Sequence, residues 1–485
     1  MKEKIIAIDQ GTSSTRSVLY SSKGELLDSS QEEFAQYFPD EGWVEHNPEM
    51  IWETVKSTLT SIVKKNKLSS TEIASIGITN QRETTVVWNK VTGIPIYNAI
   101  VWQDRRTSDY CEQIVSHIDT IHKKTGLILD PYFSATKINW LLKNIVGARE
   151  LADKGELLFG TIDTFLIWKL TKGKSHKTDI TNASRTMLFN IIDQKWDEEL
   201  LELFDVPKSM LPEVCDNVFD FGVTDIIGGE VNIGGVAGDQ QAALIGQCCF
   251  KPGETKSTYG TGCFMITNTG ENCLFSENKL LTTVAYRIKN EIIYALEGSI
   301  FVAGSAIQWL RDELNFFEDS SQTEEFATNA SEESKVLVVP ALTGLGAPYW
   351  DANARGAIFG LTRDTGKEDI TKATLESITY QSKDLVQSMK RDRASFEKLM
   401  IDGGMVANDW FCQKLSNVLE VEVERPQIIE TTSLGAAFLA GMSADIFEDF
   451  NSLRHLKSVD KTFVPVKENN NYEESIRLCH STVGV

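Results

Sequence analysis

The first residues that could do chemistry stand in a polar turn, Gly11–Arg16, directly after the short apolar run Ile5–Ile8. The apolar run predicts a buried strand. The turn combines a glycine, hydroxyl side chains and an arginine, which together let a backbone approach a phosphate and bond its oxygens. Asp9, at the end of the strand, suits a water-mediated Mg²⁺ site, because Mg²⁺ binds few carboxylates and keeps its waters. A hydroxyl-rich hairpin turn capped by Asp9 is the alternative interpretation of the same residues.

A second polar turn, Asn80–Thr84, lies between two apolar runs that predict strands. Its adjacent Arg82 and Glu83 could bind the hydroxyl groups of a polyol, because a guanidinium donates hydrogen bonds and a carboxylate accepts them. Trp102 and Tyr132 lie further along the chain and could supply an apolar wall, although packing in a core is the commoner place for a tryptophan. A surface turn with solvated charges is the alternative for Arg82 and Glu83.

Asp239 marks a third candidate position, between the glycine-rich segment Gly228–Gly238 and a short helix predicted over Gln240–Gln247. A carboxylate at the carboxyl end of a strand is well placed to act as a general base. It would be equally ordinary as the N-cap of the helix. Two more turns add to the set: Tyr259–Phe264 has the hydroxyls and glycines of a phosphate-binding turn, and Asp402–Asn408 is a tight turn before a predicted helix.

Several common site motifs are missing from the sequence. Gly173–Ser175 is the nearest approach to a Walker A motif, but Trp168 occupies the position of its first glycine. No G-x-G-x-x-G follows a predicted strand, which leaves a dinucleotide-binding fold unsupported. The eight cysteines form no C-x-x-C and the six histidines form no H-E-x-x-H. Reduced thiols of a cytoplasmic protein are therefore predicted, and neither a zinc site nor a disulfide framework.

The 485-residue chain carries 69 acidic and 48 basic side chains, a formal net charge of −21. That balance argues against binding to nucleic acids or to anionic membrane surfaces, because both need clustered Lys and Arg. Positive charge for a phosphorylated substrate would have to be local: a metal ion, one or two arginines, or backbone N–H groups. The apolar run at the N-terminus is too short for a signal peptide. The most membrane-like window, Ile292–Leu310, contains Glu297, and a buried helix or strand pair is predicted there instead of a span.

Two halves of similar design are predicted to position these residues. The first opens with a strand–turn–strand over Ile5–Tyr20, followed by a helix over Pro48–Lys65 whose apolar residues recur at helical spacing. Turn residues at Lys251–Glu254 indicate a domain boundary, and a second strand–turn–strand follows over Lys256–Thr269. The repetition is weak evidence for an internal duplication. Further predictions are helices near Gly304–Leu314, Asp369–Met389, Asp409–Leu419 and Ser433–Gly441, a polar acidic loop over Asp319–Ser334 and a surface turn at Glu468–Asn471.

Together these motifs resemble those of the FGGY carbohydrate kinase family, within the actin-like (RNase H-like) ATPase superfamily. The resemblance extends from Ile6 to about Pro465. Asn80–Arg106 is most similar to the members that phosphorylate glycerol, whereas the opening Asp-x-Gly-Thr marks only the superfamily. The stretches that carry the resemblance are AIDQGTSSTRSVLY, GWVEHNP, GITNQRETTVVWNKVTGIPIYNAIVWQDRR, DPYFSATKINWLL, TNASRTMLFN, AGDQQAALIGQ, STYGTGCFM, AGSAIQWLRDE, GLGAPYWDANARGAIFGLTR, DGGMVAND and TSLGAAFLAG.

The resemblance implies an α/β fold with two actin-like ATPase domains, residues 1–247 and 248–485, flanking an active-site cleft. It implies ATP-dependent phosphorylation of glycerol to sn-glycerol 3-phosphate, with ATP and Mg²⁺ as cofactors, in a cytoplasmic homodimer or homotetramer. Neither nucleic-acid binding nor a membrane span is expected. The alternatives are a kinase for another small polyol or a ketose, and a catalytically idle nucleotide-binding scaffold. The intact set of Asp9, Arg82, Glu83 and Asp239 argues against the scaffold.

The resemblance also implies a role for individual residues of this chain. The phosphate-binding hairpin matches Thr12, Ser13, Ser14 and Arg16, with Asp9 on the Mg²⁺ side and Thr261 on a second such hairpin. The nucleotide pocket matches Gly304, Gln308, Gly404 and Asn408. The glycerol site matches Arg82, Glu83, Trp102, Tyr132, Asp239, Gln240 and Phe264, with Asp239 as the general base.

The chain departs from the family pattern in a few places. Ser13 and Thr15 exchange hydroxyl types, which should preserve hydrogen bonding, and Asp104 is a charged residue at a variable position. The segment Phe221–Val236 and the tail after Pro465 fit the family poorly.

Regulation is predicted from what one segment lacks. Bacterial members similar to this chain carry, before the glycine-rich strand, either an arginine-containing loop that binds fructose bisphosphate or a loop with a phosphorylated histidine. Here Gly222–Val231 contains no Arg, Lys or His. A bound sugar bisphosphate needs fixed positive charge, and Asp225 and Glu230 would repel it. Insensitivity to both controls is therefore predicted, unless regulation enters elsewhere, for instance through the tail.

Overall fold

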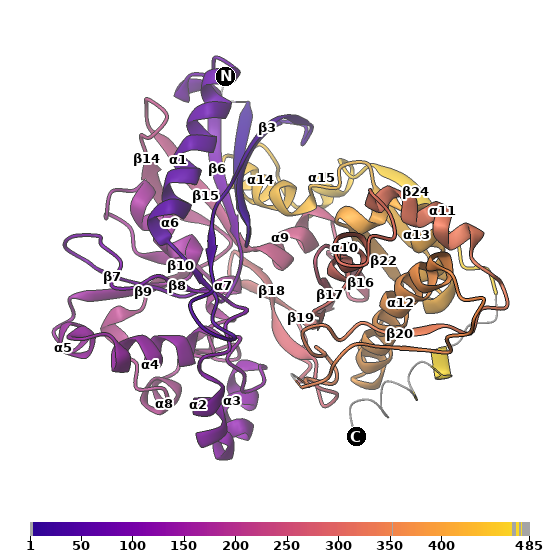
Figure 1. Cartoon of the computed structure of the whole chain (residues 1–485). Coiled ribbons are helices and arrows are strands. Elements are labelled where there is room, and N and C mark those ends of the chain that lie inside the picture. The colour runs from indigo at the N-terminus through magenta and orange to yellow at the C-terminus, as the bar shows by residue number, and fades with distance from the viewer. Residues whose placement is uncertain (1–2, 352, 468–471, 475–476, 478–485) are drawn as a thin grey trace.

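The computed structural model describes residues 3–351, 353–467, 472–474 and 477, and the two halves of the chain occupy opposite sides of the molecule (Figure 1). Each half is built on one large β-sheet. The first sheet contains, in spatial order, β14 (Val218–Thr224), β15 (Val231–Gly238), β6 (Ile73–Asn80), β1 (Lys4–Gln10), β2 (Ser14–Ser21) and β3 (Leu26–Glu33). The second contains β18 (Leu281–Ile288), β19 (Glu291–Ile300), β17 (Cys263–Gly270), β16 (Glu254–Tyr259), β22 (Lys398–Asp402), β23 (Val423–Pro426) and β24 (Val459–Phe463).

The four central strands of each sheet share one topology. In the first, β1 pairs antiparallel with β2 and parallel with β6, and β6 pairs parallel with β15. In the second, β16 pairs antiparallel with β17 and parallel with β22, and β22 pairs parallel with β23. The internal duplication predicted from the two opening hairpins is therefore present in the strand order. Because each hairpin starts its own sheet, the two predicted phosphate-binding turns occupy corresponding positions in the two halves.

The helix predicted over Pro48–Lys65 is α1, and its bounds are the predicted ones. Asn47 caps it, because its side chain accepts hydrogen bonds from the backbone N–H groups of Glu49 and Met50, and a proline occupies the first turn. The buried face of α1 lies against β2 and β3. This packing supports the strands that carry the first hairpin.

The other helices lie in the connections between strands, and the four predicted for the second half are α10, α12, α13 and α14. In the first half they are α2 (Ser108–Gln113), α3 (Ile118–Thr125), α4 (Ser134–Asn144), α5 (Ala148–Asp153), α6 (Ile162–Leu170), α7 (Ile180–Ala183), α8 (Glu198–Leu203) and α9 (Asp239–Gly246). In the second half they are α10 (Gly304–Asp312), α11 (Thr323–Asn329), α12 (Lys367–Arg391), α13 (Asp409–Leu419), α14 (Thr431–Ser443) and α15 (Phe450–Arg454). The small sheets comprise β4 (Gln36–Tyr37), β5 (Glu45–His46) and β8 (Ala99–Ile100), β7 (Val86–Asn89) with β9 (Leu157–Gly160), β10 (Lys177–Asp179) with β13 (Glu213–Cys215), β11 (Phe189–Asn190) with β12 (Lys195–Trp196), and β20 (Leu337–Val339) with β21 (Ala357–Phe359).

The polar acidic loop predicted over Asp319–Ser334 is wrong in part, because the segment contains α11. This helix buries only a narrow stripe, Thr323 and Ala327, so that its polar face dominates the sequence pattern. Asp319 caps the short 3₁₀ turn that precedes it, and the helix packs against α12 and α13. Tertiary packing therefore stabilises a helix that the local pattern does not reveal.

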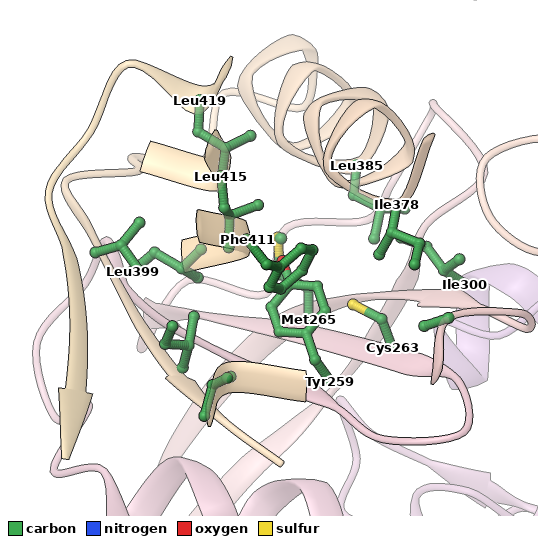
Figure 2. Packing of buried hydrophobic residues seen from close by; sticks show 14 of the residues in the cluster. Tyr259, Cys263, Met265, Ile300, Ile378, Leu385, Leu399, Phe411, Leu415 and Leu419 are labelled. Atoms are coloured by element: carbon green, nitrogen blue, oxygen red, sulfur yellow. The ribbon is translucent and has the colours of Figure 1, made fainter. Parts of the chain in front are cut away.

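The core of the second half lies between its sheet and the helices α12 and α13 (Figure 2). Tyr259 and Met265 point from the β16–β17 hairpin toward Phe411 and Leu415 of α13. The rings of Tyr259 and Phe411 meet edge to face with their centroids 5.2 Å apart. Both rings are fully buried, and this packing anchors the hairpin whose turn contains Thr261.

Helix α14 belongs to the second half in sequence but packs on the first sheet, against β1, β6, β15 and the neighbouring α9 (Figure 1). Small residues permit this close approach. A Cβ added to Gly435 would lie 1.8 Å from the carbonyl oxygen of Ala242, and one added to Gly77 would lie 2.2 Å from that of Ala436. Tyr20 and Ser433 also share a buried hydrogen bond of 2.8 Å between their hydroxyls. The first sheet and α14 therefore form one packed unit.

The window Ile292–Leu310 forms the end of β19 and the start of α10, a strand and a helix rather than a strand pair. Across the described residues, no helix is long and apolar enough to cross a membrane. In the same part of the chain the cysteines are free, and all except Cys273 are buried. The surface turn predicted at Glu468–Asn471 lies outside the described residues.

Candidate active site

The first candidate hairpin is the turn between β1 and β2. The Gly11 N–H donates a 2.9 Å hydrogen bond to the Ser14 carbonyl, which closes the turn. The Thr12 hydroxyl accepts a 3.0 Å bond from the indole N–H of Trp102, and Ser13 is exposed. Thr15 is fully buried and shares a hydrogen bond with Thr54. Thr12, Ser13 and Ser14 therefore remain near the surface of the turn, whereas Thr15 belongs to the core.

Arg16 lies on β2 and does not point freely at a ligand. Its guanidinium forms an ion pair with Glu430, the residue before α14, and donates a 2.9 Å hydrogen bond to Gln31. Its charge is thus shared with a carboxylate from the other half of the sequence. Neutralising a phosphate, the role expected for Arg16, would require this ion pair to rearrange.

Asp9 lies half-buried at the base of the hairpin. Burial raises the pKa of its carboxyl to about 7; Glu430 and Asp239 raise it further, and Arg16 opposes the rise. A carboxylate among two other acids is a reasonable contact for a hydrated divalent cation, because the cation would relieve their repulsion. The described residues contain no ready-made cluster of three metal ligands, so direct protein coordination by several side chains is not indicated.

The raised pKa of Asp9 predicts a pH-dependent contribution to stability. The pKa of this carboxyl is about 7 in the folded protein, against an ordinary 3.8. The free energy of unfolding therefore falls as the pH rises through that interval, because the buried carboxyl must ionise. We expect Asp9→Asn to gain stability relative to the wild type between pH 5 and pH 8, by on the order of 2 kcal/mol for a partly exposed group. Urea unfolding at both pH values measures the difference. An Asp9→Asn effect that is equal at pH 5 and pH 8 would contradict the assignment.

Arg82 and Glu83 lie in a buried cluster of charges where the two halves meet. The Arg82 guanidinium donates bonds of 2.5 and 2.9 Å to the two carboxylate oxygens of Glu297, on β19 of the second sheet. Its Nε lies 3.1 Å from Oδ1 of Asp239. Arg185 donates 2.6 Å from Nε to Glu83 and 3.1 Å from Nη2 to Glu297. Three carboxylates thus surround two guanidinium groups.

The backbone at Glu83 is strained, with φ at +60° in a non-glycine residue. Its carbonyl accepts hydrogen bonds of 2.9 Å from Ser134 and 3.0 Å from Thr85, which hold the turn in place. Burial raises the pKa of the Glu83 carboxyl, while Arg185 and Arg82 counteract that rise. Such a turn, rigid and completely buried, is not the solvated surface turn that was the alternative for Arg82 and Glu83.

Asp239 follows β15 directly, as predicted, but α9 begins at Asp239 itself, one residue earlier than predicted, and Gly238 is its N-cap, so the alternative role of Asp239 as N-cap is wrong. Its side chain is 30% exposed, so it stands at the edge of the buried cluster. Burial raises the pKa of its carboxyl, and Arg82 and Lys256 act in the opposite direction. A half-buried carboxylate of raised pKa, open on one side, has the properties of a general base.

An aromatic wall stands beside the cluster. Trp102 meets Tyr132 and Phe264 edge to face, with centroid separations of 5.7 and 5.9 Å. Phe264 belongs to β17, so this wall also combines side chains from both halves. Trp102 and Tyr132 line a cavity of about 390 Å³, together with Trp350 and Arg105.

Gln240 follows Asp239 and is held from the second sheet. The buried ammonium of Lys256 donates to Oε1 of Gln240 and, over 2.9 Å, to the hydroxyl of Thr258. Burial lowers the pKa of Lys256, against the attraction of Asp402 and Asp239. Lys256 was not singled out from the sequence, where it reads as one more residue of a strand.

The nucleotide-type residues gather around a separate cavity of about 410 Å³ in the second half. Gly304 packs closely on the neighbouring hairpin, since a Cβ there would lie 2.5 Å from the carbonyl oxygen of Gly260, whereas a Cβ at Gly404 would meet no atom within 4 Å. The open backbone at Gly404 and the size of the cavity are compatible with a nucleotide. The predicted residues that line it are Thr261, Gly304, Gln308, Gly404 and Asn408.

Asn408 also caps helix α13, in addition to lining the cavity. Its Oδ1 accepts a 2.9 Å bond from the Phe411 N–H as the cap of α13, and its Nδ2 donates to Thr323 over 3.1 Å. The structure therefore brings the predicted residues together in two places, a charged and aromatic site between the halves and a nucleotide-sized cavity beside it. Three further residues of the charged site, Arg185, Lys256 and Glu297, were not predicted from the sequence. Of these, only Glu297 could have been noticed, because it is a charged residue inside the apolar window Ile292–Leu310.

Family models match both halves of the chain. Residues 4–246 match the N-terminal domain of the FGGY family of carbohydrate kinases, and residues 255–444 match its C-terminal domain. The chain therefore belongs to the FGGY family of carbohydrate kinases.

Proteins of similar sequence indicate which members of the FGGY family this chain resembles most. The chain is 56% identical over 472 residues to the glycerol kinase of Marinomonas sp. (strain MWYL1), covering 96% of each chain. It is 53% identical to the glycerol kinase of Streptococcus gordonii, covering 97% and 95%. Among solved structures, Plasmodium falciparum glycerol kinase with ADP superimposes with a TM-score of 0.91 at 36% identity, covering 99% and 97%. A xylulose kinase from Lactobacillus acidophilus, at 22% identity and a TM-score of 0.88, shares the fold. The predicted α/β fold with two actin-like domains is confirmed.

Proposed function

We propose that this protein transfers a phosphoryl group from ATP to glycerol and releases sn-glycerol 3-phosphate. The observation that carries the proposal is the cluster of Arg82, Glu83 and Asp239 at the meeting of the two halves, in a chain whose near relatives are glycerol kinases. We further propose that the two domains divide near Gln247. The reaction needs mainly positioning and charge stabilisation, which a preorganised cluster supplies.

The acceptor site would use the charged and aromatic side chains together. Arg82 donates and Glu83 accepts hydrogen bonds from the glycerol hydroxyls, and the amide of Gln240 adds a further polar contact. Trp102, Tyr132 and Phe264 face the carbon chain. Because the hydroxyl-binding groups are buried, an acceptor that fails to pair them would leave them unsatisfied.

Asp239 would remove the proton from the attacking hydroxyl. Its raised pKa makes it a stronger base than an ordinary aspartate, and Arg82 keeps it ionised. The proton taken from the attacking hydroxyl would stay on Asp239, whose side chain is 30% exposed and can release the proton to water. Closure of the two halves would exclude water from the acceptor position, where water would otherwise be phosphorylated.

The nucleotide would bind across both hairpins. The turn hydroxyls Thr12, Ser13 and Ser14 and the Thr261 turn would bind the phosphate chain, and Gly304, Gln308, Gly404 and Asn408 would border the nucleoside. Asp9 would hold the hydrated Mg²⁺, and Arg16 would add positive charge once it leaves Glu430. Bound Mg-ATP supplies the phosphoryl group and a cation that offsets its charge.

A coupled assay of ADP release tests the function and its acceptor. We expect turnover with glycerol, and turnover on propane-1,2-diol or propane-1,3-diol lower by about 10² or more, because each lacks one hydroxyl that the site would pair. A ketose such as xylulose tests the alternative kinase activity, and no ADP release with any acceptor would favour an idle scaffold. Equal efficiency with propane-1,3-diol would contradict the hydroxyl-binding role of Arg82 and Glu83.

The structure places lysine side chains beside the segment on which the predicted insensitivity to fructose bisphosphate depends. Gly222–Val231 borders a surface cavity of about 340 Å³ whose lining includes Lys172 and Lys174, from the connection after α6, and Lys177 at the start of β10. Lys172 is paired with Asp225 over 2.6 Å, and further acids line the same cavity, so the local charge stays balanced. We expect initial rates at saturating ATP and glycerol to be unchanged by millimolar fructose bisphosphate. Clear inhibition would contradict this prediction, as would labelling of a histidine by a phosphocarrier protein.

Assembly into a homodimer or homotetramer in the cytoplasm remains part of the proposal. Sedimentation analysis of the purified chain at micromolar concentration measures the oligomeric state directly.

A further inference from the structure

Glu297 lies at the centre of the charged cluster and has no part in the function proposed so far. It stands on β19, in the second sheet, and its side chain is completely buried. Burial alone would raise the pKa of this carboxyl, but Arg185 and Arg82 hold it at about 2. Glu297 is therefore ionised across the whole working range of pH.

The geometry of Glu297 limits the orientation of Arg82. Two parallel hydrogen bonds, 2.5 Å from Nη1 to Oε2 and 2.9 Å from Nη2 to Oε1, fix the plane of the guanidinium. With that plane fixed, the remaining Nε faces Asp239 at 3.1 Å. Nη1 also donates a longer, 3.2 Å bond to Oε1 of Gln241, so the two shorter bonds to Glu297 are the main constraint on how Arg82 is presented to the proposed base.

The same carboxylate also orders Glu83, through Arg185. Nη2 of Arg185 donates to Glu297 over 3.1 Å, and its Nε donates to Glu83 over 2.6 Å. Nη1 of Arg185 is buried and has no hydrogen-bond partner among the described residues. Arg185 therefore serves as a bridge between two acids, and its orientation depends on Glu297.

We propose that Glu297 is a positioning residue that aligns Arg82 directly, and Glu83 through Arg185, so that the acceptor site is complete only when β19 lies against the first half. This proposal rests on the proposed function and deepens it. Glycerol recognition would then depend on contact between the two halves, in addition to residues that touch the substrate. Charge balance alone would not require the two-bond geometry, because any nearby carboxylate could neutralise Arg82.

The sign of a pH effect follows from the groups that face Asp239. These are Arg82, Lys256 of β16, Glu297 of β19 and Asp9 of β1. Glu297 repels the ionised form of Asp239 and so raises its pKa. Replacing Glu297 by a neutral residue would remove that repulsion and free Arg82 to pair more closely with Asp239, and both changes lower the pKa of the base. The acid limb of kcat would move to lower pH.

The test compares Glu297→Gln with Glu297→Asp and with a matched control, Glu376→Gln. Glu376 is another buried glutamate of the second half; it pairs with Lys414 over 3.0 Å and lines a surface cavity that contains none of the residues of the charged cluster. For Glu297→Gln we expect the KM for glycerol to rise by about tenfold to a hundredfold, the KM for ATP to stay within about twofold, and the acid limb of kcat to move to lower pH. Glu297→Asp should recover part of the lost affinity, and Glu376→Gln should leave all three quantities unchanged.

Several outcomes would overturn the proposal. One is a Glu297→Gln variant with lowered melting temperature but wild-type KM for glycerol and an unmoved acid limb; another is an equal rise in the KM for ATP. If Glu297→Gln does not fold, Arg185→Lys replaces it, because lysine keeps the charge but lacks the planar fork whose Nε and Nη2 donate separately to Glu83 and Glu297. A normal KM for glycerol in Arg185→Lys would also count against the proposal.

The proposed function can fail separately. If the wild type turns over another polyol or ketose but not glycerol, the choice of acceptor is wrong, and the same Glu297 comparison is made with the acceptor that is used. If the wild type turns over no acceptor, both proposals are overturned.

Discussion

Asp239→Asn is expected to lower kcat by about 10²- to 10⁴-fold, the usual contribution of a positioned general base, while glycerol still binds. Asparagine keeps the shape of the side chain, and its amide oxygen can still accept the 2.7 Å bond from the Gln240 N–H and face the Arg82 Nε 3.1 Å away. It cannot accept the proton of the attacking hydroxyl. Coupled ADP release measures kcat, and calorimetric titration with glycerol measures binding.

A matched control for this substitution is Asp384→Asn. Asp384 is also buried, burial raises its pKa to about 6, and it accepts hydrogen bonds from Tyr349 and Tyr472, outside both cavities that form the proposed site. We expect its asparagine variant to change stability but not kcat. Near-normal turnover of Asp239→Asn, with Asp384→Asn behaving alike, would show that Asp239 is not the base.

Arg82→Met should weaken both the fold and the binding of glycerol. The substitution leaves Glu297 and Glu83 with the guanidinium of Arg185 and takes the Arg82 guanidinium away from Asp239, and broken buried pairs of this kind cost about 3–5 kcal/mol. The glycerol KM should rise by about 10² or more, because the principal donor to the hydroxyls is lost. Urea unfolding and glycerol titration of kcat measure the two effects separately.

Arg106→Met is the matched control. Arg106 is as deeply buried as Arg82 and pairs with Asp104 at 2.7 Å and Glu45 at 2.8 Å, within the first half. A comparable loss of stability is expected there, with an unchanged KM for glycerol. If both variants raised that KM equally, the effect of Arg82 would be a consequence of general destabilisation and not of contact with the acceptor.

Much of the fold could be predicted because its signals are local. The bounds of α1 follow from a capping residue, a first-turn proline and apolar residues at helical spacing, all within one short segment. The two hairpins and the position of Asp239 at the end of β15 are equally local. The weak helix α11 was missed, because its burial depends on contacts with α12 and α13 and not on its own pattern.

The residues of the candidate site likewise fall into those that have a local signal in the sequence and those that have none. Arg82, Glu83 and Asp239 stand beside recognisable strand ends, so their types and spacing, with the family resemblance, were enough to select them. No periodicity marks Arg185 or Lys256, whose immediate neighbours in sequence are serines and threonines that turn out to be buried. Periodicity reports whether a side chain is buried, but it does not report which other side chain it meets.

The sequence by itself determined the opening strands, the duplicated hairpins, the polar residues at the ends of particular strands and six of the helices, namely α1, α9, α10, α12, α13 and α14. Only the tertiary structure decided that Glu297 aligns Arg82 across 215 residues of chain, that Arg185 bridges Glu83 and Glu297, and that α14 returns to pack on the first sheet. The physical reason is that a buried charge is tolerated only beside its partner, and which partner it finds depends on how distant strands and helices are brought together.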